Sequence, residues 1–123
     1  MNGLARLLGA LGAMGGGLGV AAGAVAAHVL RLEAGTRDAH LFDTAVNYLL
    51  LHAVLVVALA ITTRHRGWFV VMGLMLAGMV CFSGGLMVQV GTGNKVPLIP
   101  FGGLCFIAGW LVAAGMCLWR RAS

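Results

Sequence analysis

The sequence is poor in charged residues and in proline. Only 9% of its 123 residues are charged and two are proline, whereas 61% are hydrophobic and 20 are glycine. An ordinary soluble domain has about a quarter charged residues, and a chain this short could not bury so many apolar residues in a soluble core. High hydrophobicity equally excludes intrinsic disorder. The composition therefore predicts a small integral membrane protein.

Cysteine and acidic residues are also scarce, with three of each. An odd number of thiols, without a Cys-x-x-Cys pair, argues against a disulfide framework and against a structural zinc site. We interpret the cysteines as small apolar core residues: Cys81, Cys105 and Cys117. Eight Lys/Arg give a net charge of +5. They flank apolar runs and form no basic face with interleaved aromatics, so we expect contacts with anionic lipid headgroups and no nucleic-acid partner.

Four apolar runs are long enough to cross the bilayer, which takes about 20 residues in a helix. They cover approximately residues 7–30, 41–62, 68–90 and 99–119. The runs are continuous, unlike the short alternating segments of a barrel, and in lipid an isolated segment satisfies its backbone only as a helix. The first run imitates a signal peptide, but it is longer than a usual signal core, and we expect it to be retained. The sequence thus predicts one all-α domain over residues 1–123, a four-transmembrane-helix bundle.

Basic residues at the ends of the runs predict the topology. One side carries five: Arg6, Arg64, Arg66, Arg120 and Arg121. The other carries three: Arg31, Arg37 and Lys95. The positive-inside rule then places both termini in the cytoplasm. Trp68 and Trp119 would lie at that interface as aromatic anchors, and Thr36 or Asp38 is expected to cap the second helix.

Glycine recurs every four residues in the first run, at Gly15, Gly19 and Gly23. A helix face without side chains lets a neighbouring helix approach closely, which contributes much of helix association in lipid. The full predicted set of helix-packing positions is Gly15, Gly19, Gly23, Gly84, Gly102, Gly103 and Gly109. The partner of these faces is either another helix of the same bundle or a second protein, and both alternatives remain open.

Polar side chains inside a membrane span are candidate functional groups because they are costly there. Thr44, Tyr48 and His52 share one helix face. By the helical rise, His52 lies roughly 15 Å and Ser83 roughly 10 Å from the same membrane surface. We therefore expect Thr44, Tyr48, His52 and Ser83 to form one polar layer. They either hydrogen-bond to one another and fix the packing, or line a path for protons or a small solute.

A metal or haem site is a third interpretation, and the spacing disfavours it. His28 and His52 differ in depth by roughly 12 Å, too much for both to bind one haem iron. The seven methionines are scattered, which favours packing over copper binding. No carboxylate lies at the depth of His52 to orient the imidazole, and we find no catalytic motif. The sequence predicts no cofactor, no metal and no enzymatic activity.

Four segments in this order resemble a known family. They are residues 23–28 (GAVAAH), residues 42–48 (FDTAVNY) with His52, residues 82–86 (FSGGL), and residues 100–104 (PFGGL) with 109–111 (GWL). Together they resemble the YgdD-like small inner-membrane proteins, domain of unknown function 423, which are related to a small eukaryotic transmembrane protein. The chain departs from the family pattern at Ala27, usually glycine, and at Gly85, often serine.

The resemblance implies a four-helix protein of the inner membrane and no established biochemical activity. The family's recurrent positions correspond to His28, Thr44, Tyr48, His52, Ser83, Gly84, Pro100, Gly102, Gly103, Gly109 and Trp110. Our first hypothesis is a non-enzymatic membrane protein that acts by packing, as a homo-oligomer or as an accessory subunit of a larger complex. The alternatives are a small transporter or proton-coupled element using Tyr48, His52 and Ser83, and a redox-cofactor protein.

Overall fold

The computed structural model describes residues 2–30 and 33–122, which are helical over nearly their whole length. The elements are α1 (Gly3–Val25), η1 (Ala26–Leu30), α2 (Arg37–Thr62), α3 (Arg66–Gly78), η2 (Met79–Gly84), α4 (Gly85–Thr92) and α5 (Ile99–Ala122). Because α3, η2 and α4 run on as a single helix, these residues form four helices long and apolar enough to cross a membrane. The predicted all-α, four-span fold is confirmed.

Side-chain caps start α1 and α2 about one turn before the predicted apolar runs. The Asn2 side chain accepts a hydrogen bond from the Ala5 N–H (2.8 Å). The Thr36 hydroxyl accepts one from the Ala39 N–H (3.2 Å), so Thr36 is the cap of α2 and Asp38 lies in its first turn. Such caps satisfy N–H groups that have no partner within the helix. Both helices therefore extend beyond the residues that hydropathy alone marks.

The third span contains a π-helical segment, η2, at its centre. An extra residue per turn widens the helix there and shifts the side chains that follow it onto a different face. The segment ends without a break, since α4 continues to Thr92 and stops at Gly93, whose φ of 74° is the left-handed conformation that glycine adopts readily. Hydropathy does not reveal this insertion, and the sequence predicted a regular helix.

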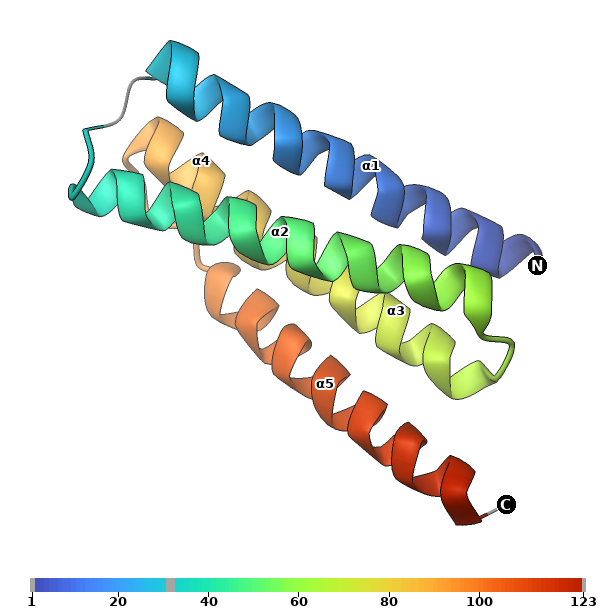
Figure 1. Cartoon of the computed structure of the whole chain (residues 1–123). Coiled ribbons are helices and arrows are strands. Elements are labelled where there is room, and N and C mark those ends of the chain that lie inside the picture. The colour runs from blue at the N-terminus through green and yellow to red at the C-terminus, as the bar shows by residue number, and fades with distance from the viewer. Residues whose placement is uncertain (1, 31–32, 123) are drawn as a thin grey trace.

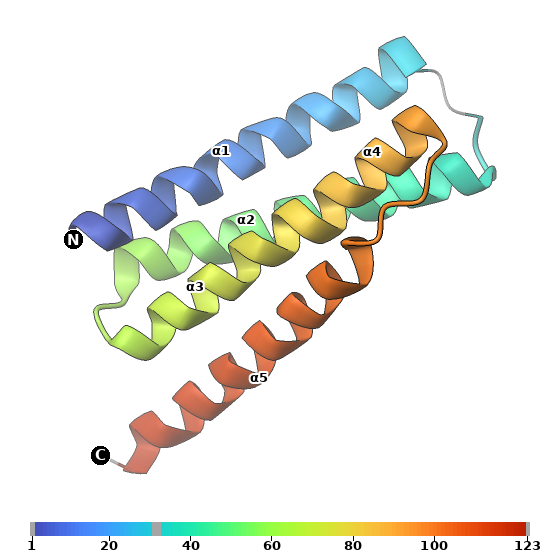
Figure 2. The same ribbon diagram turned by 180° about the vertical axis from the view of Figure 1, so that it is seen from behind.

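The helices form an open array (Figure 1). α1 packs along α2, α3 and η2 pack against α2, and α5 packs on α3 and η2. Both views place α1 and α5 on opposite sides of the α2–α3–α4 hairpin (Figure 2). Both termini lie at the same end of the molecule as the turn between α2 and α3. The two outer helices are consequently the most exposed: within an apolar 18-residue stretch of each span, 11% of the residues are buried in the first span and 22% in the fourth, against 39% in the second.

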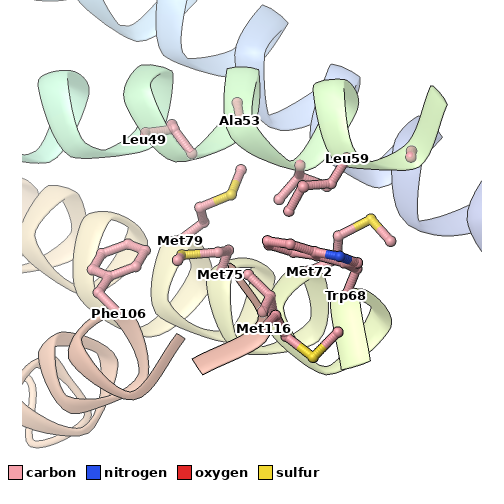
Figure 3. Close-up of a cluster of buried hydrophobic side chains, with 12 residues drawn as sticks. Leu49, Ala53, Leu59, Trp68, Met72, Met75, Met79, Phe106 and Met116 are labelled. Atoms are coloured by element: carbon pink, nitrogen blue, oxygen red, sulfur yellow. The ribbon is translucent and has the colours of Figure 1, made fainter. Parts of the chain in front are cut away.

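The core lies between α2, the third span and α5 (Figure 3). Its buried residues are Leu49, Ala53, Val56, Leu59, Ala60, Trp68, Val71, Met72, Met75, Met79, Phe106 and Met116. Trp68 is therefore a core residue, only 8% exposed, and the prediction that it anchors the interface is wrong. Trp119 is exposed and packs edge-on against His65. Cys117, expected in the core, is exposed as well.

Candidate functional site

His52 is the most constrained polar residue inside the membrane span. It lies in the middle of α2, is 2% exposed, and has hydrogen bonds at both ring nitrogens. The Trp110 indole N–H donates to His52 Nε2 (3.2 Å), and His52 Nδ1 lies 2.6 Å from the Tyr48 carbonyl oxygen. An indole nitrogen is only a donor, so Nε2 must be unprotonated. The imidazole is therefore neutral, with its proton on Nδ1 donated to Tyr48.

Aromatic rings enclose this imidazole. The Phe106 ring stacks on it with centroids 3.8 Å apart and planes 18° from parallel. The Tyr48 ring packs against Phe82 of η2 at 5.0 Å, and Phe82 meets Phe106 edge-on at 5.8 Å. The cluster of Tyr48, His52, Phe82, Phe106 and Trp110, called here the His52 cluster, thus joins α2, η2 and α5. Through it α5 is tied to α2, although its backbone packs on the third span.

The spacing on α5 explains how this helix reaches His52. Phe106 and Trp110 are four residues apart and share one helix face. One turn earlier on the same face, Gly102 lies against the backbone of η2, where an added Cβ would be 2.7 Å from the Phe82 Cβ. An added Cβ at Gly109 would be 2.9 Å from the Met75 terminal methyl. Glycine at these two positions lets α5 approach the third span closely enough for its aromatic pair to meet α2.

Ser83 is fully buried in η2, and its hydroxyl has no hydrogen-bond partner among the residues that the structure describes. The sequence suggested that Ser83, Tyr48 and His52 hydrogen-bond to one another; in the structure His52 is bonded to the Tyr48 backbone and to Trp110 instead. Thr44 donates its hydroxyl to the His40 carbonyl of its own helix (2.9 Å) and contributes no bond to the cluster. Tyr48 and His52 are thus brought together, while Ser83 and Thr44 are not joined to them by hydrogen bonds.

The predicted glycine positions differ in what surrounds them. An added Cβ at Gly19 would lie 2.8 Å from the Leu50 side chain of α2, and one at Gly15 would overlap the tip of Met79. At Gly23, Gly84 and Gly103 the nearest atoms are at 3.7 Å or more, which is ordinary contact. Gly15, Gly19, Gly102 and Gly109 therefore lie at close helix contacts, and the other three do not.

Three members of the cluster are absent from the predicted polar layer. Trp110 enters the sequence analysis only as a family position and Phe82 only within the segment FSGGL, while Phe106 does not enter it at all. The signal was the spacing of four residues between Phe106 and Trp110, with glycines three and four residues from Phe106 at Gly109 and Gly102. That pattern indicates one helix face that carries both aromatic rings and small residues, although it does not say which helix packs against it.

No group of three or more His, Cys, Asp or Glu side chains comes together among residues 2–30 and 33–122. The buried methionines serve packing, because three of their tips end against glycines of neighbouring helices: Met79 against Gly15, Met75 against Gly109, and Met116 against Gly67. His28 is exposed in η1 while His52 is buried, so the described side chains offer no paired imidazoles. Both His52 nitrogens are already bonded, which leaves neither free to act as a base.

Comparison with known proteins supplies the family. The family model described as "Protein of unknown function (DUF423)" matches residues 22–103. The chain belongs to this family. A UPF0382 membrane protein of Staphylococcus aureus (strain bovine RF122 / ET3-1) is 33% identical over 115 residues, covering 86% of this chain and 88% of the relative. The UPF0382 inner membrane protein YgdD of Escherichia coli (strain K12) is 33% identical over 103 residues, covering 80% and 79%.

A UPF0382 membrane protein of Staphylococcus haemolyticus is 32% identical over 115 residues, covering 86% of this chain and 88% of the relative. No solved structure matches the chain. As a member of the DUF423 family with four span-length helices, the chain is an integral membrane protein in a lipid bilayer.

Several of the positions by which this DUF423 chain resembles its family meet in the structure. His52, Trp110 and Tyr48 belong to the His52 cluster. Gly102 and Gly109 allow the close approach of α5 that completes it. Within this chain, these family positions therefore gather at the junction of α2, η2 and α5.

Proposed function

We propose that this protein is a non-enzymatic subunit that acts by helix association in the inner membrane, as a homo-oligomer or as an accessory part of a larger membrane complex. We also propose that both termini face the cytoplasm, since five of the eight basic residues lie at the end that carries them. The name of the Escherichia coli relative, an inner membrane protein, supports the location. The observation that carries the proposal is a shallow groove on the outer face of α1 and α2.

The α1–α2 groove has a volume of about 360 Å³ and is lined almost entirely by apolar atoms. Its lining residues are Gly12, Ala13 and Gly16 of α1 with Leu50, Ala53, Val54, Val57, Ala58 and Ile61 of α2. Small residues of this kind let a further helix come close, so that van der Waals contact replaces lipid. Gly16 is available for such contact because its nearest neighbour within the chain, the Ala53 Cβ, is 3.7 Å from an added Cβ.

Filling the groove tests the proposal. Gly16→Leu places a side chain in it without a clash at the Cβ, whereas Gly17→Leu adds the same side chain where nothing lies within 4 Å and outside the groove. Native mass measurement after gentle extraction should show an assembly for the unchanged protein and for Gly17→Leu, and a monomer for Gly16→Leu. A strictly monomeric unchanged protein with no co-purifying protein would refute the proposal, as would equal assembly of both variants.

One observation favours the transporter as second candidate. The Ser83 hydroxyl is fully buried, without a partner, in the π-helical segment beside the His52 cluster. Buried polar groups in a span mark ion and solute paths more often than other positions do. Against this role, both ring nitrogens of His52 are bonded and no acidic side chain lies at its depth. Vesicles reconstituted with the unchanged protein should show a flux of protons or of a small solute that His52→Ala abolishes. No flux, or equal flux in both proteins, removes this candidate.

A further inference from the structure

A small pocket opens at the end of the molecule that carries both termini. It lies between the start of α1, the end of α2 and the start of α3, elements that meet at this end in both views (Figure 2). Its volume is about 180 Å³. Since about 10–15 Å³ by a comparable measure holds one water molecule, there is ample room for a phosphate group. None of the functions considered above uses this pocket.

Polar and apolar residues line this pocket together. Asn2, Thr63 and Arg64 are its polar lining residues. The remaining lining residues are apolar: Ala5, Ala60, Ile61 and Phe69. The pocket therefore lies where the hydrocarbon-facing surface meets the headgroup region, and its mixed lining suits a phospholipid headgroup with its glycerol end.

Its hydrogen-bonding groups suit an anion. The Asn2 carbonyl oxygen is occupied by the Ala5 N–H, which leaves the side-chain amide N–H groups as donors. The Thr63 hydroxyl is committed as a donor to the Leu59 carbonyl (2.8 Å). Arg64 supplies a positive charge, and its guanidinium can bind two phosphate oxygens in a bidentate geometry.

The charge distribution leaves Arg64 without an acidic side chain as a partner. All three acidic residues of the chain, Glu33, Asp38 and Asp43, lie before or within the start of α2, at the opposite end of that helix from Arg64. Arg6 and Arg66 add positive charge at the pocket's own end. An anion bound there meets only attraction from the charged side chains of that end.

We propose that this pocket binds the phosphate of an anionic phospholipid, held by the Arg64 guanidinium and the Asn2 amide with its glycerol end over Ile61 and Phe69. The apolar lining residues favour a lipid over free phosphate, because burying apolar surface against them adds binding energy for a lipid and none for a free ion. A direct hydrogen bond from a charged side chain to phosphate contributes binding equivalent to about a fivefold change in affinity or more, whereas a nearby charge that makes no contact is screened by solvent and contributes less. A bidentate contact strengthens the direct bond, so removing Arg64 should weaken binding about five- to tenfold.

The test is native mass spectrometry of the full chain in detergent micelles, titrated with phosphatidylglycerol or phosphatidylcholine. The unchanged protein should bind phosphatidylglycerol at lower concentration. Arg64→Gln should raise the half-saturating phosphatidylglycerol concentration about five- to tenfold. For Arg64→Lys this concentration should lie between the values for the unchanged protein and for Arg64→Gln. Arg66→Gln, which removes the same charge two residues away and outside the pocket lining, should change it less than about twofold.

Three outcomes would overturn the proposal. Equal losses for Arg64→Gln and Arg66→Gln would mean diffuse attraction to the basic end and no site. Equal affinity for the two lipids would remove the anionic requirement. Displacement of phosphatidylglycerol by inorganic phosphate at comparable concentration would assign the pocket to the free ion. Arg64 is exposed, so its variants should fold, and equal melting temperatures verify that the comparison concerns binding.

Discussion

Gly102 is the position where α5 comes closest to the backbone of another helix. A Cβ added there would overlap the Phe82 backbone nitrogen and lie 2.8 Å from the Cys81 carbonyl carbon. A backbone atom cannot move aside as the tip of a side chain can, so Gly102→Ala must push α5 away from η2. That displacement would also loosen the stacking of Phe106 on His52, because the same helix face carries both contacts.

The expected cost follows from these contacts. Overpacking a well-filled contact costs typically 1–3 kcal/mol, and an overlap with backbone belongs at the upper end, at about 3 kcal/mol. This is about a hundredfold in the folding equilibrium and a large part of the 5–15 kcal/mol typical of a folded domain. Gly115→Ala is the matched control, since the same helix has nothing within 4 Å of an added Cβ there. Alanine in that helical position should stabilise by about 0.4–1 kcal/mol.

The assay is reversible unfolding in micelles by increasing sodium dodecyl sulfate, followed by tryptophan fluorescence. It measures the difference in free energy of unfolding between each variant and the unchanged protein. The sodium dodecyl sulfate concentration at the midpoint of unfolding should fall for Gly102→Ala, and it should be unchanged or higher for Gly115→Ala. If both alanine variants unfold at the midpoint of the unchanged protein, α5 does not pack on η2 as described, and the geometry of the His52 cluster fails with it.

Three further predictions concern the same assay. Ser83→Ala should be neutral or stabilise by up to about 1 kcal/mol, because a buried hydroxyl without a partner is unfavourable; a loss above about 1 kcal/mol would reveal a partner. Trp110→Phe should cost about 1–2 kcal/mol by leaving His52 Nε2 without its donor. Combining it with His52→Ala should give a coupling energy of about 1 kcal/mol, and additive effects would mean that no such bond exists. Gly19→Leu should destabilise more than Leu55→Ala, because a whole side chain cannot fit over α2 at Gly19; equal midpoints would contradict this.

The four spans were predictable because hydrocarbon selects for long apolar runs, and each run became a helix. The predicted ends were short at α1 and α2 because the helices continue into the polar interface, where Asn2 and Thr36 cap them. Thr36 was predictable from its residue type. The π-helical segment was not, since an inserted residue leaves composition and hydropathy unchanged.

The candidate site shows where single-sequence reasoning stops. Tyr48 and His52 were predictable as neighbours because a spacing of four on one helix fixes their relation. Which helix faces them depends on how α5 is placed against α2, and no local pattern encodes that. Depth estimates put Ser83 near His52, yet depth says nothing about direction around a helix axis, and the hydroxyl of Ser83 is left without a bond.

The pattern of glycine and methionine suggests how an open array keeps a defined shape with little burial. Four glycines on α1, α3 and α5 each receive one long side chain: Met79 at Gly15, Met116 at Gly67, Phe106 at Gly78 and Met75 at Gly109. In lipid, where little hydrophobic drive exists between helices, such close contacts supply the attraction. The thioether adapts to irregular gaps, whereas the bonded His52–Trp110 pair is directional and selects one placement of α5. Packing therefore supplies the strength of the assembly and the His52 cluster its register, which explains why a histidine without a free nitrogen lies buried in the span.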